Sequence, residues 1–271
     1  MRLATIELNN RQLPVVLEEG RVLPVRAPSL LDALRAEPEP RSWPLEDALQ
    51  IDGPPVLRTP LRPGKIVAIG LNYRDHIRET GMDAPAAPLI FAKFPSCVVG
   101  PEDAVVLPAM APEKVDWEVE LAVVVGRRMQ DVSTERALDF VLGYTVANDV
   151  SARDVQFADG QWVRGKSFDT FCPLGPVLVS REELTDPQAL KLSTRVNGEV
   201  LQDSSTAEMV FSAAEILSYC SSCFPLDPGD IVLTGTPWGC GGFMDPPRFL
   251  HPHGVPVSTM SPGSRGKQEE Q

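Results

Sequence analysis

The chain has 271 residues, of which 43% are hydrophobic and 23% charged, and this composition is typical of a folded globular protein and excludes a disordered chain. Its formal net charge of −12 disfavours nucleic acid and anionic membrane surfaces as partners, because both would repel it. The same charge would repel an anionic substrate. A site for such a substrate therefore needs a local positive centre, either a metal ion or a few placed Lys and Arg side chains.

The sequence also argues against insertion into a membrane and against export. Its longest apolar runs, such as 121–125, are far too short to span a bilayer, and the first residues lack a secretory signal. The five Cys are therefore expected to be reduced thiols in a cytoplasm. The single CxxC pair, Cys220 and Cys223, lies in a helical pattern and is interpreted as ordinary thiols, not as a redox or zinc pair.

Residues 1–60 are predicted to form a small β-rich domain followed by a linker. The elements expected there are strands over 4–8, 13–17 and 22–25 and a helix over 30–36 with Ser29 as its N-cap. Four prolines between 54 and 63 crowd a stretch without periodicity, which indicates the linker.

Residues 61–250 are predicted to form the main domain. Its expected strands cover 65–70, 105–107, 115–125, 143–147, 177–179, 192–196 and 231–234. Helices are expected over 134–141 and from 206 to about 220, the second with a capping box made by Ser205 and Glu208. Asn197-Gly198 predicts a hairpin turn. Many strands against few helices favour a mostly-β or α+β fold over a doubly wound sheet.

The end of the chain has a different composition. Residues 235–271 contain 7 Gly and 6 Pro in 37 positions, and the last eleven residues are polar without periodicity. Such a segment has little apolar surface to bury, so residues 251–271 are predicted to be a disordered tail.

Acidic residues alternate with apolar ones along the strand predicted over 115–125. Glu118 and Glu120 then share a face that becomes apolar at Ala122 and Val124. A solvated face is the ordinary interpretation of such a strand. However, two carboxylates about 7 Å apart on a face that becomes buried repel each other unless a cation lies between them. Oxygen ligands alone suit Mg²⁺, Mn²⁺ or Ca²⁺.

A third carboxylate could complete such a metal site. Asp149 follows directly after the strand predicted over 143–147, and side chains at a strand end are well placed to meet a ligand. The alternative is a local turn in which Asn148 or Asp149 bonds nearby backbone.

A His–Glu pair follows the strand predicted over 65–70. His76 and Glu79 are three positions apart, so on a helical turn they lie on one face. A carboxylate beside an imidazole raises its basicity and fixes its tautomer, as a general base requires. A solvated surface pair is the alternative, but His76 is the only His before the tail.

Two further segments could contact a substrate. Lys166 lies between Gly165 and Ser167, so it could approach a ligand closely and offset carboxylate charge. Thr234-Gly-Thr-Pro237 ends a strand in a tight turn whose hydroxyls and amides could hold a carboxylate. A solvated lysine and a plain turn are the respective alternatives.

Over residues 60–245 the chain resembles the fumarylacetoacetate hydrolase family. The motifs that carry the resemblance are Gly70-Leu-Asn-Tyr-Arg-Asp-His, Val115-Asp-Trp-Glu-Val-Glu-Leu, Asn148-Asp-Val-Ser-Ala-Arg-Asp, Gly165-Lys-Ser-Phe-Asp-Thr-Phe, Val196-Asn-Gly-Glu and Leu233-Thr-Gly-Thr-Pro. Several such motifs in one order make a highly specific signal.

The resemblance implies a twisted, barrel-like β-roll preceded by a small N-terminal domain, usually in a homodimer. The residues that match the family's metal ligands are Glu118, Glu120 and Asp149, with Mg²⁺, Mn²⁺ or Ca²⁺ as the expected ion. The other matched residues are His76 and Glu79 as the acid–base pair on a mobile lid, Lys166 as the active-site lysine, and Arg153, Gln156 and Thr236 near the substrate.

The resemblance further implies an enolate mechanism on a small 2-oxo or β-dicarbonyl acid. Acylpyruvate-type C–C hydrolysis is the first expectation, and keto–enol tautomerisation or decarboxylation of oxaloacetate is the alternative, because all three share the enolate. One departure from the family is expected after Leu250, where its final strands would be missing. An inactive relic with an incomplete end therefore also remains open.

Overall fold

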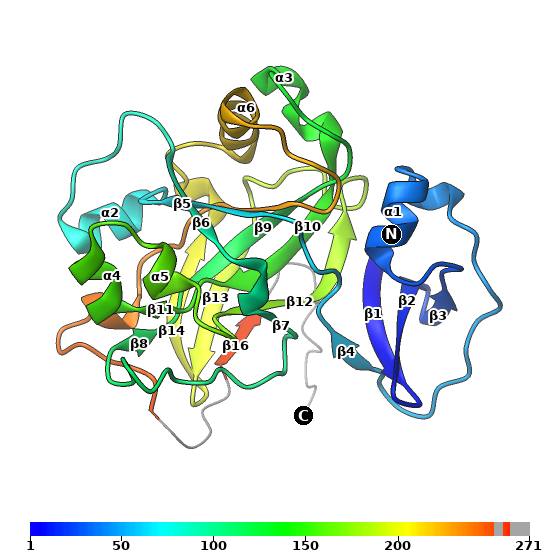
Figure 1. Cartoon of the computed structure of the whole chain (residues 1–271), viewed down its shortest axis with the longest axis horizontal. Coiled ribbons are helices and arrows are strands. Elements are labelled where there is room, and N and C mark those ends of the chain that lie inside the picture. Colours follow the sequence, from blue (N-terminus) through cyan, green and yellow to red (C-terminus); the bar gives the residue numbers. More distant parts are fainter. Residues whose placement is uncertain (252–256, 261–271) are drawn as a thin grey trace, which may run out of the picture.

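A computed structural model describes residues 1–251 and the backbone of 257–260, and it has two parts of unequal size (Figure 1). An eleven-stranded sheet runs through both parts, with nine strands in the order β3-β2-β1-β12-β10-β9-β15-β5-β6, while β4 pairs with β1 and β7 pairs with β12. A three-stranded sheet, β14-β13-β16, and a two-stranded one, β11-β8, complete the larger part. The described chain is therefore mostly sheet with a few short helices, as predicted.

The strands are β1 (Arg2–Leu8), β2 (Arg11–Glu18), β3 (Arg21–Pro24), β4 (Val56–Arg58), β5 (Ile66–Gly70), β6 (Leu89–Lys93), β7 (Val98–Val99), β8 (Val115–Asp116), β9 (Val119–Val125), β10 (Val141–Asn148), β11 (Ser151–Ala152), β12 (Cys172–Ser180), β13 (Lys191–Val196), β14 (Glu199–Ser205), β15 (Ile231–Leu233) and β16 (Val257–Met260). The α-helices are α1 (Leu30–Ala36), α2 (Arg74–Thr80), α3 (Thr134–Ala137), α4 (Arg153–Asp159), α5 (Val163–Lys166) and α6 (Ala213–Cys223). Short 3-10 turns are η1 (Pro40–Ser42), η2 (Pro95–Cys97), η3 (Leu138–Phe140), η4 (Thr206–Glu208) and η5 (Gly241–Phe243). No helix in the described part of the chain is long and apolar enough to cross a bilayer.

Strand β9 separates two hydrophobic cores, and every residue in it is buried. On one face Val119, Leu121 and Val123 pack in a cluster that includes Ile216 and Leu217 of α6. On the other face its small and branched residues join a second cluster that reaches the N-terminal part. Because a strand buried on both faces has no solvated side, the carboxylates at its start are also removed from water.

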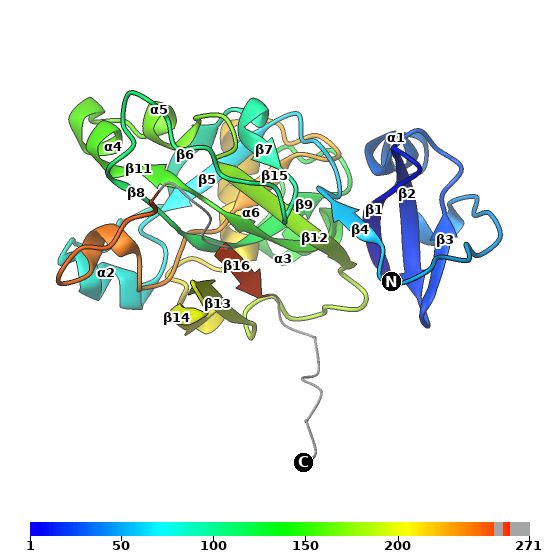
Figure 2. The same cartoon turned by 90° about the horizontal axis from the view of Figure 1, so that it is seen from below.

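The N-terminal part forms a lobe beside the larger part, as seen from below in Figure 2. Strands β1–β3 form a meander, and the N-cap predicted at Ser29 is present, because its side chain accepts from the Asp32 amide. The lobe shares a sheet with the rest of the chain through two residue pairs, Arg2↔Val179 and Leu3↔Leu178. The predicted linker is not wholly irregular, since β4 pairs with β1 within it.

Two predicted strands differ from those found. Residues 105–107 form no strand, because the amide of Val106 bonds to the Thr170 hydroxyl and its side chain is exposed. The strand predicted over 115–125 is split after Asp116, where the Glu118 amide donates to the Asn148 side chain. A side chain thus replaces a ladder partner at the position where the site begins.

The helix predicted from residue 206 begins later. Ser205 caps only the 3-10 turn η4, whereas the capping box is made by Ser212 and Glu215 at the start of α6. Both segments contain the same Ser-x-x-Glu spacing, so the capping box was predicted at the first pair, whereas the structure has it at the second. The hairpin turn at Asn197-Gly198 is present with both residues at positive φ, as this turn type requires.

The prediction that no regular structure follows Leu250 is wrong for residues 257–260. These form β16, which pairs antiparallel with β13 in four register pairs from Ser193↔Met260 to Val196↔Val257. Backbone pairing needs no apolar composition, so the polar content of the segment did not exclude it. The remainder of the predicted tail, 252–256 and 261–271, lies outside the described residues.

Candidate active site

Three buried carboxylates come together at the junction of β9 and β10. Glu118 lies just before β9, Glu120 lies on it, and Asp149 follows β10 directly. The antiparallel register places Ala147 opposite Glu120, so the end of β10 lies beside the start of β9. A carboxylate oxygen from each of the three lies within 4.8 Å of the others. The three residues that the sequence singled out as metal ligands are therefore adjacent, and their exposed fractions are only 5%, 1% and 0%.

Two buried lysines pair with carboxylates of this cluster. Lys166, at the end of α5, places its Nζ 2.8 Å from Glu118 and 2.6 Å from Asp149. Lys93, at the end of β6, reaches the other oxygen of Asp149 at 2.6 Å and also donates to the backbone carbonyl of Lys166. Asp149 is thus held from both sides by ammonium groups.

Arg153 supplies the third buried cation. From the first turn of α4 its Nε donates to Asp116 at 2.7 Å, and its Nη2 forms an ion pair with Glu118 at 2.6 Å. It also donates to the Gln156 side chain at 3.0 Å, one helical turn away. Asp116 accepts a further bond from the Gly242 amide, and burial raises its pKa to about 6 despite Arg153.

The cluster holds one more carboxylate than cation among the described residues. The carboxylates are Asp116, Glu118, Glu120 and Asp149, and the cations are Lys93, Arg153 and Lys166. Burial opposes ionisation of Glu118, but Lys166 and Arg153 outweigh it and lower its pKa to about 2. Burial, Asp149 and Glu118 instead raise the pKa of Glu120 well above its usual range, although Lys166 and a hydrogen bond from the Gly235 amide oppose the shift. Mg²⁺ prefers oxygen ligands, and this cluster offers only carboxylate oxygens. One carboxylate also lacks a cationic partner, so the cluster fits a divalent cation.

The His–Glu pair lies on α2, as the spacing predicted. His76 Nδ1 is 2.8 Å from Glu79 Oε2, and the other Glu79 oxygen accepts from the Gly239 amide at 2.8 Å. The His76 ring is 6% exposed and meets the Phe243 ring edge to face. The imidazole is therefore oriented by a carboxylate that is itself fixed by backbone.

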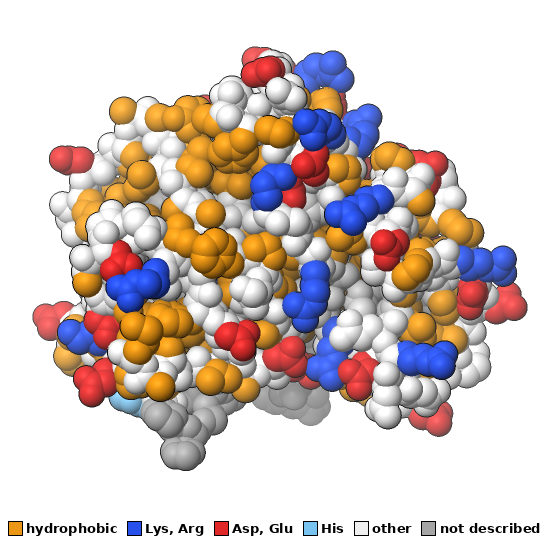
Figure 3. Space-filling model, viewed as in Figure 1, with side chains coloured by type: hydrophobic (Ala, Val, Ile, Leu, Met, Phe, Trp, Pro, Cys, Tyr) orange, Lys and Arg blue, Asp and Glu red, His pale blue; other side chains and the backbone are white. Residues whose placement is uncertain are grey.

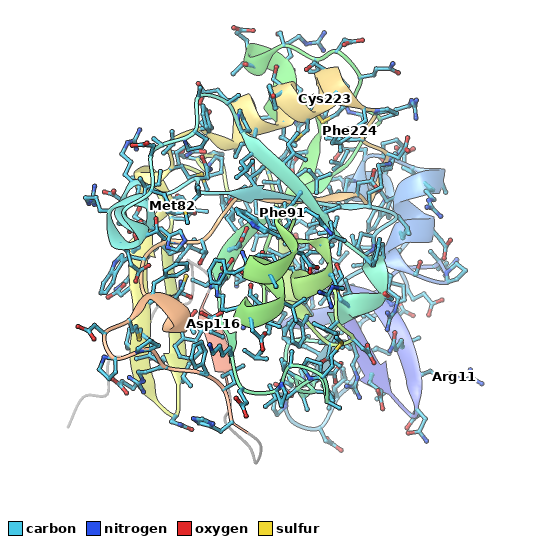
Figure 4. The ribbon with its side chains drawn as sticks, turned by 60° about the vertical axis from the view of Figure 1, so that its left-hand side comes forward. Arg11, Met82, Phe91, Asp116, Cys223 and Phe224 are labelled. Atoms are coloured by element: carbon cyan, nitrogen blue, oxygen red, sulfur yellow. The ribbon has the colours of Figure 1, made fainter. Side chains whose placement is uncertain are left out.

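One cavity of ≈ 40 Å³ joins the two groups. Six of the nine residues predicted for the site line it, and these are His76, Glu118, Arg153, Gln156, Lys166 and Thr236. Its outer wall is apolar and includes Met82, Phe91, Phe157, Trp162 and Phe243, and Figure 4 shows Met82 beside α2 and Phe91 on β6. This volume holds only a few water molecules, so a substrate needs α2 or a side chain to move.

Sequence reasoning missed two residues that position the site. Lys93 offered only the signal of a lone charge at the end of an apolar strand. Gln202 of β14 accepts from the Val119 amide at 2.9 Å and donates to the Thr236 hydroxyl at 2.9 Å. Nothing in the sequence near Gln202 indicates these distant partners.

Residues 65–261 match the family model for the C-terminal domain of fumarylacetoacetate (FAA) hydrolase. The chain belongs to the fumarylacetoacetate hydrolase family. The solved structure of a fumarylacetoacetate hydrolase from Exiguobacterium antarcticum is similar to this one over 97% of this chain and 96% of that chain. The two sequences are 35% identical, and the TM-score is 0.88. A 5-carboxymethyl-2-hydroxymuconate delta-isomerase from Mycobacterium smegmatis is 36% identical, with a TM-score of 0.77, over 89% of this chain and 90% of that one.

Curated family members at higher identity are named as tautomerases. "Oxaloacetate tautomerase Fahd2a, mitochondrial" from Rattus norvegicus is 50% identical over 190 residues, which are 70% of this chain and 60% of that protein. "Oxaloacetate tautomerase FAHD2A, mitochondrial" from Homo sapiens is also 50% identical, over 191 residues with the same coverage. The match thus spans 60% of the length of these relatives.

Proposed function

We propose that this chain is a divalent-metal-dependent enzyme that interconverts the keto and enol forms of oxaloacetate or a similar small 2-oxo acid. The observation that carries the proposal is one cavity lined by both an oriented imidazole and the cationic edge of a buried carboxylate cluster. The names of the curated relatives support oxaloacetate as the first substrate to test.

In this proposal Glu118, Glu120 and Asp149 hold Mg²⁺, with Mn²⁺ or Ca²⁺ as alternatives. When bound, the ion supplies Lewis-acid stabilisation of the negative charge that develops on the substrate. The ion would also provide the local positive centre that an anionic substrate needs, because the net negative charge of the chain would otherwise repel that substrate.

The chain's own residues move the proton. His76, oriented by Glu79, removes a proton from C3 of the keto acid and then returns it to the oxygen on C2, so the imidazole ends in its starting state. Only a C–H bond is broken and an O–H bond formed, so tautomerisation requires no positioned water. Lys166 places a positive charge at the cavity wall and stabilises the enolate electrostatically, and Arg153, Gln156 and Thr236 orient the acid.

Acylpyruvate-type hydrolysis is a second candidate, favoured by the apolar outer wall of the cavity. Phe157, Trp162 and Phe243 suit an apolar acyl substituent better than the second carboxylate of oxaloacetate. In that reaction the His76–Glu79 pair would activate water for attack on the acyl carbonyl, and the C–C bond to the enolate would break. Decarboxylation of oxaloacetate passes through the same enolate and is distinguished by release of CO₂.

A homodimer in the cytoplasm also belongs to this proposal. Large apolar side chains such as Phe94, Val106 and Met110 are 59%, 60% and 65% exposed, and Figure 3 shows apolar groups spread over the face of the larger part. Exposed apolar area of this kind is typical of association surfaces. Light scattering of the purified chain measures the state directly.

The test is a comparison of substrates with and without Mg²⁺. Enol oxaloacetate is mixed with the protein in weak buffer, and its ultraviolet absorbance is followed against the buffer-catalysed rate; acylpyruvate cleavage and CO₂ release are measured in parallel. The proposal expects metal-dependent acceleration of the oxaloacetate reaction. A protein that binds no Mg²⁺ or Mn²⁺ and accelerates none of these reactions would instead support the inactive relic.

A further inference from the structure

Cys240 is a buried thiol that no step of the proposed reaction uses. It lies in the segment that follows β15 and is 0% exposed. Its Sγ is 3.9 Å from His76 Nδ1, 3.7 Å from the Pro237 carbonyl oxygen and 3.8 Å from the Gln202 amide nitrogen. These contacts are long, so the thiol is held beside the imidazole without a strong hydrogen bond.

Cys240 completes a set of three different donor atoms. His76 Nδ1, one oxygen of Glu79 and Cys240 Sγ all lie within 4.8 Å of one another. The set therefore combines nitrogen, oxygen and sulfur, whereas the cluster around Glu118 offers oxygen alone. Nitrogen and thiolate ligands select zinc-type cations, and oxygen ligands select Mg²⁺, so the two adjoining sets have different metal preferences.

We propose that His76, Glu79 and Cys240 form a second metal site, specific for zinc-type cations, whose occupation inhibits the enzyme. The Gly239 amide fixes one oxygen of Glu79 and leaves the other toward His76, so two of the ligands are already oriented. Three protein ligands leave a fourth position open for water. The imidazole also lines the cavity, so one of the three proposed ligand residues borders that space.

Binding of a cation would change the protonation state of the thiol. Burial, followed by Glu118, raises the pKa of Cys240 well above its ordinary value, so without a cation the thiol stays protonated. A coordinated thiol is deprotonated outright, and its proton is released to solvent. Binding itself does not depend on the proposed function. Inhibition does, because the cation would occupy the groups that move the substrate proton.

Cobalt(II) is the probe for binding, because thiolate ligation gives an intense sulfur-to-cobalt charge-transfer absorption. The full chain is first saturated with Mg²⁺ to fill the oxygen cluster, and Co²⁺ is then added. The absorption is expected in the wild type and in Cys223→Ser, and not in Cys240→Ser or Cys240→Val. Cys223 is the matched control, since it is exposed on α6 and Figure 4 shows it well apart from Asp116.

Zinc inhibition provides the second measurement. At saturating Mg²⁺, Zn²⁺ should inhibit the wild type, and Cys240→Ser should weaken its affinity by more than the roughly 10–100-fold that loss of an outer-shell partner causes. Absence of the cobalt absorption in the wild type, or its loss only in Cys223→Ser, overturns the site. If the chain shows the cobalt absorption but has no activity, the second metal site is supported and the proposed function is contradicted.

Discussion

The two halves of the candidate site are held in different ways. The acidic half starts on strands β9 and β10, and Glu118 and Asp149 each make two ion pairs with buried cations. The other half lies on the seven-residue helix α2. There Glu79 accepts a hydrogen bond from the Gly239 amide and makes a second one with His76. One half is fixed by the sheet, and the other lies on a short helix in which His76 is the one buried residue.

This difference matches what each half has to do in the proposed reaction. A divalent cation needs ligands that hold their positions, and buried ion pairs on central strands provide them. A cavity of ≈ 40 Å³ must open to admit a substrate, and a short helix with one buried residue can move more easily than the fully buried strand β9. Changes in the acidic half should therefore affect stability and activity together, whereas changes on α2 should affect turnover alone.

Glu118→Gln should have the largest effect. It removes one metal ligand and one partner of both Lys166 and Arg153, so activity should fall at least about 10²–10³-fold and Mg²⁺ binding should weaken strongly. The ion pairs also predict a loss of about 3 kcal/mol in the free energy of unfolding, because a buried pair is broken.

Activity assays, calorimetry with Mg²⁺ and urea unfolding measure the three effects of Glu118→Gln. The matched control is Glu208→Gln, whose carboxylate is 39% exposed and meets Arg78 only at 3.5 Å, so it should resemble the wild type. Full Mg²⁺ affinity in the Glu118 variant would exclude this residue from the metal site.

Lys93→Met tests whether the buried ion pairs of the acidic half stabilise the fold. The substitution leaves one oxygen of Asp149 and the Lys166 carbonyl without their donor, so the free energy of unfolding should fall by about 3 kcal/mol. Lys191→Met is the control, because that lysine is 71% exposed and pairs with Asp203 at the surface, where the cost should stay below about 0.5 kcal/mol. Equal unfolding curves for the two variants would contradict the comparison of the halves.

The local parts of the site could be predicted from sequence. The His76–Glu79 pair needs only helical spacing, and the shared face of Glu118 and Glu120 needs only strand alternation. The partners of Asp149 are different: Lys93 is 56 positions away, at the end of β6, and three strands separate β6 from β10 in the sheet, so only the tertiary fold brings the two side chains together. Composition and periodicity carry no information about such a pairing.

The missed elements have the same cause. The capping box was predicted at Ser205 because two Ser-x-x-Glu spacings occur within eleven residues, and packing of α6 in the cluster with β9 and β10 favours Ser212. Strand β16 was missed because its pairing is with β13, a strand about sixty residues earlier, and local composition does not reveal such a partner. In both cases tertiary contacts decide between local alternatives.

His76→Ala should act on turnover, in contrast to the changes in the acidic half. Loss of the proton-transfer group should lower kcat by about 10²-fold with little change in KM, because the imidazole acts mainly in the transition state. Arg78→Ala is the control on the same helix, since its side chain is 68% exposed. Unchanged kcat in the His76 variant would remove this residue from the mechanism.

Removal of β16 should have the smallest effect, because it lies on neither half. A chain ended at His251 lacks the strand that pairs with β13, and the free energy of unfolding should fall by about 1–2 kcal/mol as a few backbone hydrogen bonds are lost. Strand β13 is also linked to the site, because Thr194 donates to Gln202, which bonds the Val119 amide and the Thr236 hydroxyl. Truncation should therefore lower kcat as well, but less than His76→Ala does.

A chain ended at Met260 is the control, because it keeps β16 and should match the full chain in thermal unfolding. If all three chains melt together, the pairing of β16 with β13 contributes nothing to stability.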